Sequence, residues 1–226
     1  MASPVPAPAP EPFTPPSRDC SFCPRLVEFR LRQRAAFPDW HNAPVPSFGP
    51  LEARLAIVGL APGLRGANRT GRPFTGDYAG DLLYATLLRF DLAEGVYRAD
   101  PHDGLRLKDA RIANAVRCVP PENKPTPAEF ASCRPFLRAE LASMPNLSVV
   151  LALGRGAHDQ VLRVLGVKSL AGYPFAHGRL HELPSGPVLA DSYHCSRYNT
   201  NTGRLTEAMF HDVFRAVTDR LGRARP

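Results

Sequence analysis

The sequence predicts an α/β fold in which a parallel sheet is covered by helices on both faces. Short apolar runs alternate with longer helical segments along the chain, and turn residues or helix caps separate them. This alternation is typical of parallel sheets, because each crossover connection places a helix on a face of the sheet. Ligands of such sheets bind beyond the carboxyl ends of the strands, so function is expected in the segments that follow the strands.

Four short apolar segments are the predicted strands. Most are nearly continuous apolar runs, which is typical of strands buried on both faces; the second alternates less cleanly, and the third is the strongest. The predicted strands span Arg54–Leu60, Arg111–Cys118, Leu147–Leu153 and Val188–Tyr193.

Four helices are predicted around these strands. They run over Gly80–Phe90, from Thr126 to about Ser143, from the glycines after the third strand to about Leu165, and from Thr206 to about Leu221. The second has the clearest start: Thr126 can cap the helix, Pro127 occupies its first position, and Glu129 can complete a capping box.

Length and composition indicate one globular domain over residues 17–226, preceded by a tail. The 226 residues are 44% hydrophobic and 22% charged, as in soluble proteins. Residues 1–16 are rich in proline and alanine and are expected to be disordered. No apolar run approaches the roughly 18–20 residues that span a membrane, and no signal peptide is recognisable, so a cytoplasmic location is expected.

The chain is basic, with a formal net charge of +7. Only three of its 28 basic residues are lysines. Arginine suits phosphate recognition because its planar group donates two hydrogen bonds to one anion, although a GC-rich coding bias also favours arginine. That bias does not explain the positive net charge, which favours a polyanionic partner such as DNA.

Four of the five cysteines form a candidate metal site. Cys20 and Cys23 form a C-x-x-C pair, Cys118 ends the second predicted strand, and Cys133 lies in the helix that Thr126 begins. If the N-terminal segment folds back, four thiolates could hold zinc or an iron–sulfur cubane, and the spacing does not choose between them. Buried cysteines without a metal are the alternative, whereas disulfides are not expected in a reducing cytoplasm.

The segment after the first strand, residues 59–77, combines glycines with arginines. The glycines let backbone amides approach a ligand closely, and the arginines favour an anionic one. The segment contains neither the Gly-Lys-Ser/Thr of a P-loop nor a G-x-G-x-x-G motif. An ordinary long loop is the alternative interpretation.

Two further polar residues lie at the same predicted edge of the sheet. Asn114 interrupts an apolar strand, which is costly unless its amide is satisfied, either by the backbone or by a ligand. His194 follows the last strand directly and is therefore a candidate functional residue, although a single histidine on a loop is usually a surface residue.

Together these segments resemble the family 5 uracil-DNA glycosylases. The resemblance runs from about Cys20 to the C-terminal helix. It rests on G-L-A-P-G at 59–63 with N-R-T-G-R-P-F-T-G-D at 68–77, on N-A-V-R-C-V-P-P at 114–121, and on the H-x-S-R-x-N-T loop at 194–200. It implies a three-layer α/β/α sandwich with a central, mostly parallel four-stranded sheet. It also implies a structural [4Fe–4S] cluster on Cys20, Cys23, Cys118 and Cys133.

The family's activity implies excision of uracil, hypoxanthine or xanthine from double-stranded DNA by hydrolysis of the N-glycosidic bond, which initiates base excision repair; we expect a monomer. The chain has Leu60 where family 4 enzymes carry a glutamate that serves the attacking water, so Asp77 is the candidate to orient that water. It has Cys195 where the family often has proline, which suggests a less rigid loop with an exposed thiol.

The remaining roles follow from the chemistry of a flipped base. His194 would donate a hydrogen bond to O2 of the departing uracil, while Asn114 would recognise O4 and N3–H. Phe74 would stack on the ring beside the backbone of Gly63. The residues expected to contact DNA are Arg65, Arg69 and Arg72, which would bind phosphates, and Arg197 and Tyr198, which would fill the space left by the base.

Two other classes of protein are alternatives. A non-catalytic nucleic-acid-binding module with a structural zinc would be colourless and would leave uracil-containing DNA intact. A redox protein in which Cys20 and Cys23 cycle between thiol and disulfide would not depend on Cys118 or Cys133.

Overall fold

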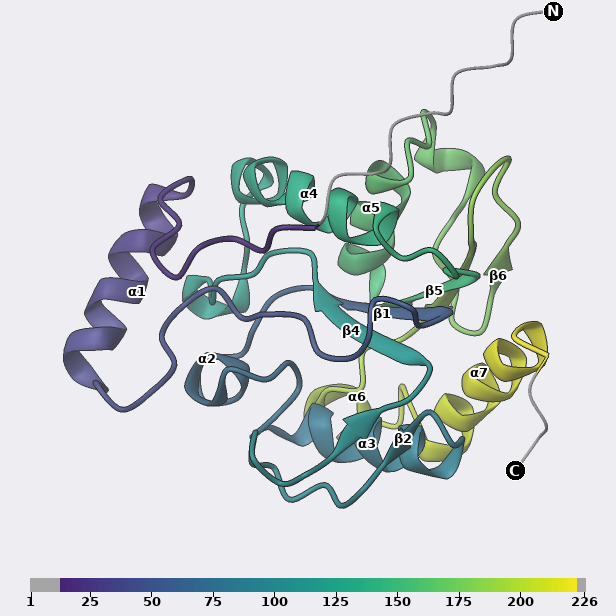
Figure 1. The fold of residues 1–226 in the computed structure, drawn as a ribbon. Helices are drawn as coiled ribbons and strands as arrows, with labels where there is room; N and C mark the ends of the chain where they lie inside the picture. The colour runs from purple at the N-terminus through teal and green to yellow at the C-terminus, as the bar shows by residue number, and fades with distance from the viewer. Residues whose placement is uncertain (1–12, 223–226) are drawn as a thin grey trace, which may run out of the picture.

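The computed structural model describes residues 13–222. Most of the predicted tail, residues 1–12, lies outside the described residues, and residues 13–16 form neither helix nor strand. The fold is a mixed α/β sandwich built on a central sheet, as the sequence predicts (Figure 1).

The central sheet has five strands in the order β4-β1-β5-β7-β6. The first four are parallel to their neighbours and confirm the four predicted strands, whereas β6 pairs antiparallel with β7 at the edge. The two-residue strand β6 is too short to show a period in the sequence. The strands are β1 (Leu55–Gly59), β4 (Ala110–Asn114), β5 (Val149–Leu153), β6 (Leu180–His181) and β7 (Val188–Ser192).

Helices cover both faces of this sheet, with α4 and α5 on one side and α3 and α7 on the other (Figure 1). Successive residues of β1 pack alternately into the cores on the two faces of the sheet. Leu55 and Ile57 belong to the core under α3 and α7, and Ala56 and Val58 belong to the core under α4 and α5. These helices are α3 (Tyr78–Arg89), α4 (Pro127–Ala142), α5 (Arg155–Val164) and α7 (Glu207–Arg220).

Two predicted helix starts, at Thr126 and Thr206, are confirmed by their caps, whereas α3 begins at Tyr78, two residues before the predicted Gly80. At the start of α4 the Thr126 hydroxyl accepts a hydrogen bond from the backbone N–H of Glu129 at 3.3 Å, and the Glu129 carboxylate accepts one from the Thr126 N–H at 2.8 Å. The Thr206 hydroxyl likewise accepts from Met209 N–H at the start of α7. Each cap satisfies backbone donors that would otherwise lack a partner.

One helix has no counterpart among the predictions. Helix α1 (Pro24–Ala36) stands beside the sandwich and buries only Leu26 and Arg30, so it carries no apolar stripe that a periodicity could reveal (Figure 1). The Arg25 guanidinium ties it to α4 through two hydrogen bonds of 2.7 and 2.8 Å to Glu129. The remaining short elements are α2 (Ala67–Thr70), β2 (Ala93–Glu94), β3 (Arg106–Leu107), α6 (Arg197–Asn201) and the 3-10 turns Pro121–Asn123 and Leu170–Gly172.

The second strand is shorter than predicted. Strand β4 ends at Asn114, so Cys118 lies in the connection beyond the sheet and does not end the strand. After Asn114 the chain still follows the continuation of β1, since Ala115 N–H donates to Gly59 O and Val116 N–H to Leu60 O. The apolar residues 115–116 therefore belong to the connection that leaves the sheet and not to β4.

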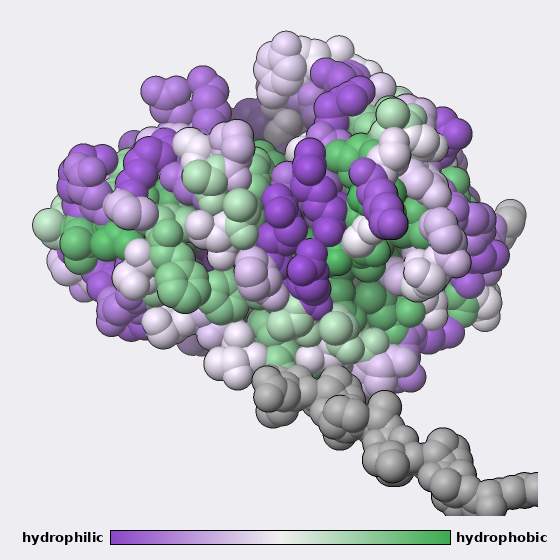
Figure 2. All heavy atoms as spheres, turned by 90° about the horizontal axis from the view of Figure 1, so that it is seen from above, coloured by the Kyte–Doolittle hydropathy of each residue, from purple (hydrophilic) through white to green (hydrophobic). Residues whose placement is uncertain are grey.

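The outer face of α4 and α5 carries mainly hydrophilic side chains with small apolar areas between them (Figure 2). Among the described residues no helix has both the length and the apolar composition needed to cross a bilayer.

Candidate active site

A cavity of about 650 Å³ lies at the carboxyl edge of the sheet, within the usual size range of ligand pockets, roughly 300–1,000 Å³. Segments that follow β1, β4 and β7 form its walls, as expected for a parallel sheet. The structure brings all the predicted catalytic and base-binding residues to this cavity: Gly63, Phe74, Asp77, Asn114 and His194.

Asn114 enters the cavity because its neighbour on β1 is a glycine. Gly59 is paired in register with Asn114, and a Cβ atom on Gly59 would lie 2.5 Å from Asn114 Oδ1 and 2.8 Å from the Phe74 ring. The side chain of Asn114 is buried, and it forms no hydrogen bond with any other described residue. A buried amide in this state is ready to bind a polar ligand.

Phe74 is held in an unusual backbone conformation, with φ of 52°. Such a conformation is strained for an aromatic residue and persists only where its surroundings enforce it. Tyr84 donates a hydrogen bond to Pro73 O at 2.6 Å, and Tyr97 donates one to Phe74 O at 3.4 Å. The loop therefore presents the Phe74 ring to the cavity, 5.8 Å from the ring of His194.

The two carboxylate oxygens of Asp77 have different surroundings. Oδ1 accepts a hydrogen bond from Gly80 N–H at 3.2 Å and caps α3. Oδ2 faces Gly63 and Gly66, where a Cβ atom on Gly66 would lie only 2.3 Å away, so glycine is needed there. Burial raises the pKa of Asp77, and the N–H groups of Gly80 and Ala79 offset part of that rise.

His194 is enclosed by protein atoms although part of its ring faces the cavity. Its ring forms no hydrogen bond with another described residue, and desolvation lowers its pKa to about 4. The imidazole is therefore neutral at physiological pH and can donate one hydrogen bond without carrying a charge. Asn199 fixes the loop by donating from its amide to His194 O at 2.8 Å.

The prediction that Arg72 binds phosphate is wrong. Its side chain is buried, and its two terminal nitrogens donate to both oxygens of Asp103 at 2.8 Å. The guanidinium also lies against the rings of Tyr84 and Tyr97. Arg72 therefore holds the loop that carries Phe74, and it is not available to DNA.

The other four predicted DNA contacts are exposed. Arg65 and Arg197 line the mouth of the cavity, and Arg69 lies beside Arg65 in the next turn. Arg197 stacks over the ring of Tyr78, with its guanidinium 5.4 Å from the ring centre. Tyr198 is 72% exposed and does not line the cavity.

Three polar residues of the cavity wall are not among the predicted site residues. Tyr78 follows Asp77 directly, Asn123 lies in the turn before α4, and Ser196 caps α6. Two of them carry a signal in the sequence: Tyr78 is an aromatic residue adjacent to a candidate catalytic acid, and Ser196 belongs to the H-x-S-R-x-N-T loop. The positive φ of Asn123, 55°, brings this turn to the cavity and depends on the fold.

Cys195 is not the exposed thiol that the sequence suggested. Its side chain is completely buried, and its Sγ donates to Ala79 O at 3.4 Å. Burial raises the pKa of Cys195 to about 12, so the thiol is neutral and unreactive. The residue packs the His194 loop against the first turn of α3.

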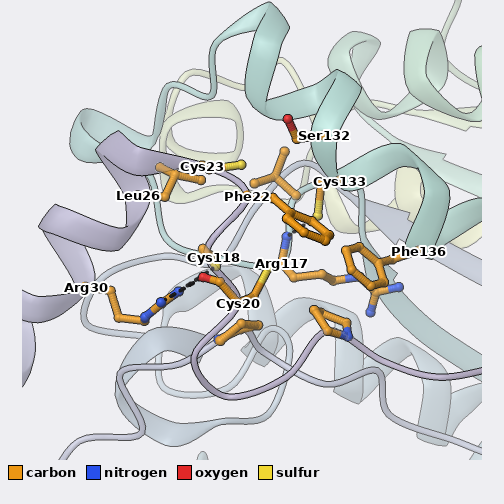
Figure 3. A pocket seen from close by; sticks show the side chains of 13 residues that line it. Cys20, Phe22, Cys23, Leu26, Arg30, Arg117, Cys118, Ser132, Cys133 and Phe136 are labelled. Atoms are coloured by element: carbon orange, nitrogen blue, oxygen red, sulfur yellow. Dashed lines mark hydrogen bonds between the residues drawn. The ribbon is translucent and has the colours of Figure 1, made fainter.

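The other four cysteines surround one pocket between α1, α4 and the connection after β4 (Figure 3). The N-terminal segment does fold back, and it brings Cys20 and Cys23 beside Cys118 and Cys133. The pocket wall is otherwise mostly apolar, with Phe22, Leu26, Val116 and Phe136 among its residues.

This environment fits a thiolate-bound metal centre better than four free thiols. Burial raises the pKa of Cys118 to about 12, and it also raises the pKa values of Cys23 and Cys133, so without a metal these thiols would be protonated. Yet donors point at the sulfurs: Arg30 Nη1 lies 3.6 Å from Cys118 Sγ, and Arg117 N–H lies 3.3 Å from Cys133 Sγ. Donors of this kind stabilise thiolates, which bind metals.

A second polar cluster, absent from the sequence analysis, lies behind the His194 loop. Asp191 of β7 accepts hydrogen bonds from His158 Nδ1 at 2.7 Å and from His181 Nε2 at 2.9 Å. The opposite nitrogen of His158 lies 2.9 Å from Tyr173 O, so both ring nitrogens face acceptors and the ring is held as a cation. We call these three buried side chains the His158–Asp191–His181 network, because each of them is hydrogen-bonded to another member.

Comparison with known proteins identifies the family of the chain. The family model of the uracil-DNA glycosylase superfamily matches residues 46–218. A type-5 uracil-DNA glycosylase from Thermus thermophilus is 46% identical over 200 residues, covering 86% of this chain and 90% of the relative. One from Pyrobaculum aerophilum is 41% identical, covering 87% of each chain.

A type-4 enzyme from Thermotoga maritima is less similar, with 38% identity over 58% of this chain and 62% of its own length. The type-5 relatives therefore match over far more of the chain than the type-4 relative does. The chain belongs to the uracil-DNA glycosylase superfamily and, within it, to the type-5 uracil-DNA glycosylases.

Proposed function

We propose that this protein removes uracil, and also hypoxanthine and xanthine, from double-stranded DNA by hydrolysing the N-glycosidic bond, and thereby initiates base excision repair. The observation that carries the proposal is the shared cavity of Phe74, Asn114 and His194, three different kinds of contact that together enclose a planar polar base. The protein would act as a monomer in the cytoplasm and would be associated with the nucleoid when bound to DNA.

Base recognition would divide between stacking and hydrogen bonding. The Phe74 ring would stack on the flipped base, and the Asn114 amide would donate to O4 of uracil and accept from N3–H. Cytosine presents a donor and an acceptor in the reverse order, so the same amide would leave buried groups unpaired. The absence of a bonded partner for Asn114 among the described residues supports this role.

Bond cleavage would depend on stabilising the leaving base. As the bond between the sugar C1′ and the base nitrogen breaks, its electron pair moves onto the base, and the neutral His194 donates a hydrogen bond to the developing charge at O2. A water molecule held by Asp77 Oδ2 adds its oxygen to C1′, and its proton passes to Asp77 or to the base. Leu60 in the cavity wall cannot orient water, so Asp77 is the carboxylate available for this step.

DNA would be held at the rim of the cavity. Arg65 and Arg69 are exposed and are suited to phosphates, while Arg197 and Tyr198 would fill the space left in the duplex. A mismatched base such as uracil opposite guanine is cheaper to extrude than a paired one, which favours deaminated sites.

We further propose that Cys20, Cys23, Cys118 and Cys133 hold a [4Fe–4S] cluster. The apolar pocket and the donors from Arg30 and Arg117 support an anionic sulfur centre. When bound, the cluster would clamp the N-terminal segment and α1 to the connection that follows β4. Purified protein should be brown, with iron and sulfide in the ratio of a cubane; a colourless zinc protein would refute this assignment.

The direct test is alkaline cleavage of duplexes that carry uracil, hypoxanthine or xanthine at one position, after incubation with the protein. We expect strand breaks at the modified base and none in the unmodified duplex, because hydrolysis leaves an alkali-labile abasic site. Intact uracil duplexes would refute the activity. Breaks at uracil alone would restrict the substrate range.

Asn114→Asp tests base recognition within the same assay. The substitution places an acceptor opposite O4 and should slow uracil release by about tenfold to a hundredfold, the range for one lost buried hydrogen bond. Asn114→Leu serves as a comparison that removes both hydrogen bonds. An unchanged rate for Asn114→Asp would mean that this amide does not contact the base.

A further inference from the structure

A second groove adjoins the cavity of Phe74, Asn114 and His194, which we call the base cavity. It contains two aromatic side chains, of which Phe37 is exposed and Trp40 is half-buried. Its lining residues are Phe37, Trp40, Arg65, Arg69 and Gly76, and we call it the aromatic–arginine groove. Its volume is about 310 Å³, and it is continuous with the base cavity because Arg65 and Gly76 line both. None of the roles assigned above uses Phe37 or Trp40.

The two aromatic rings form a stacked pair. Their centroids are 4.0 Å apart and their planes differ by 9°, and Phe37 remains 40% exposed although it follows α1 directly. Stacking the rings on each other leaves their other faces as possible platforms. A partly exposed aromatic pair beside arginines matches the chemistry by which proteins bind single-stranded nucleic acid, where bases stack on rings and phosphates lie against cations.

The fold holds this aromatic pair rigidly beside Arg69. The amide of Asn42 donates to Phe37 O at 2.7 Å and accepts from the Asn68 amide at 2.9 Å, and both asparagines are buried. In the backbone, His41 N–H donates to Arg69 O at 3.0 Å. The turn after α1 is therefore fastened to α2, the short helix that follows the loop lining the base cavity.

The charges of the groove favour a polyanion on the side of the base cavity. Arg65 and Arg69 are exposed, and neither forms an ion pair with another described residue. Beyond Trp40, a neighbouring groove shares Trp40 and Arg69 with this one and also contains Asp39 and Asp100, whose carboxylates would repel phosphates. A strand that left the base cavity would thus be guided past Arg65 toward the aromatic pair.

We propose that the aromatic–arginine groove binds the nucleotide next to the extruded one in the same DNA strand. Its base stacks against the Phe37–Trp40 pair, and its phosphates lie against Arg65 and Arg69. This inference rests on the proposed function, because it places the groove relative to the extruded base. It adds that the protein unpairs a neighbouring nucleotide and reads the strand beyond the damaged base.

Trp40 provides a local probe, because it is the one tryptophan in the sequence. An oligonucleotide with an uncleavable abasic analogue is titrated into the holoprotein while tryptophan fluorescence and anisotropy are recorded. We expect quenching of Trp40 as a neighbouring base stacks on it. In two further oligonucleotides, an abasic spacer replaces the nucleotide on the 5′ side or on the 3′ side of the analogue. Quenching should be lost only with the spacer at the position whose base occupies the groove.

Variants separate stacking from unspecific binding. Phe37→Ala and Trp40→Ala should weaken binding of this oligonucleotide by about 5- to 100-fold, the range for one lost base–aromatic stack, and Trp40→Phe should restore most of the affinity. Leu31→Ala is the matched control, because it removes another exposed apolar side chain of α1 and should leave binding unchanged.

Quenching that persists with spacers on both sides, or binding that is unaffected by Phe37→Ala and Trp40→Ala, would overturn the inference. Both results can be separated from failure of the proposed function, which is measured as uracil release by the unaltered protein. Normal uracil release without quenching rejects the groove alone. Quenching without uracil release supports the groove as a nucleotide site and rejects the activity.

Discussion

Two polar regions lie within three residues of each other at the end of β7, and they use polar side chains in opposite ways. In the His158–Asp191–His181 network the carboxylate of Asp191 accepts hydrogen bonds from both histidines and from Ala176 N–H, and both ring nitrogens of His158 face acceptors. In the base cavity, the ring of His194 and the amide of Asn114 have no hydrogen-bond partner among the described residues.

The difference indicates what each region contributes. Buried polar groups that satisfy one another stabilise the fold and hold it in one arrangement. Buried polar groups that lack a partner destabilise the fold unless a bound ligand supplies the missing hydrogen bonds. Substitutions in the network should therefore change stability, and substitutions in the cavity should change activity with little effect on stability.

The largest effect on stability is expected for Asp191→Ala. The change leaves two buried histidines and a backbone N–H without their acceptor, and it should lower the free energy of unfolding by about 3–5 kcal/mol. Urea unfolding followed by circular dichroism measures this loss, with His194→Ala as the control from the cavity. A loss below about 1 kcal/mol would show that the network does not stabilise the fold.

His194→Ala should have the largest effect on activity. Removing one donor to a developing oxyanion lowers the rate by about 10²–10³-fold in comparable sites, and we expect the same for uracil release in single turnover. Because the ring has no hydrogen bond to lose, the free energy of unfolding should change little. Turnover at the rate of the unaltered protein would refute the assigned role.

Asp77→Asn should lower activity by less, about a hundredfold, the lower end of the range for a general base, because leaving-group stabilisation carries most of the rate in the proposed mechanism. The same substitution should increase the stability of the folded state. Burial raises the pKa of Asp77, so at neutral pH its ionised form destabilises the folded state, and this penalty disappears as the pH falls below the unfolded pKa. Asparagine removes the charge and still caps α3, so the unfolding midpoint in urea should rise.

The same pKa shifts predict the acid limb of the pH–rate profile. Activity needs ionised Asp77 and neutral His194, so it should fall when acidification protonates Asp77 at a pH above the usual range of aspartates. In Asp77→Asn the remaining limb should reflect His194, whose pKa is about 4. Identical acid limbs in both proteins would contradict the role of Asp77.

The smallest effect is expected for His158→Gln, as a dependence of stability on pH. Burial alone would lower the pKa of His158, but the hydrogen bond and charge of Asp191 outweigh it and raise that pKa. The ion pair therefore contributes fully below the unfolded pKa of about 6.5 and is lost as the pH rises through the folded value. The difference in unfolding free energy between the two proteins should shrink across that interval; a constant difference would exclude a charged His158.

The strands and main helices were predictable because local chemistry decides them. The four parallel strands are mostly apolar and are buried on both faces, and the capping box at Thr126 operates between neighbours in the chain. Helix α1 was missed because an ion pair to α4 and the pocket of cysteines hold it, and neither appears as a period in the sequence.

In the candidate site, too, some residues could be assigned from the sequence and others only from the fold. Motif and position identified Phe74, Asp77, Asn114 and His194, since loops after parallel strands meet at one edge of the sheet. Motif and position could not distinguish Arg72 from its neighbours Arg65 and Arg69, because only the fold brings Asp103 to Arg72. Cys195 was likewise assigned to the surface, although Ala79 covers it.

The sequence by itself determined the four parallel strands, the helix starts at Thr126 and Thr206, and which residue types gather at the carboxyl edge. Only the tertiary structure decided which of those polar groups are satisfied by another residue and which face an open cavity. The physical reason is that hydrogen-bond partners such as Asp191 and His158 are distant in sequence, and their distance in space exists only once the chain has folded.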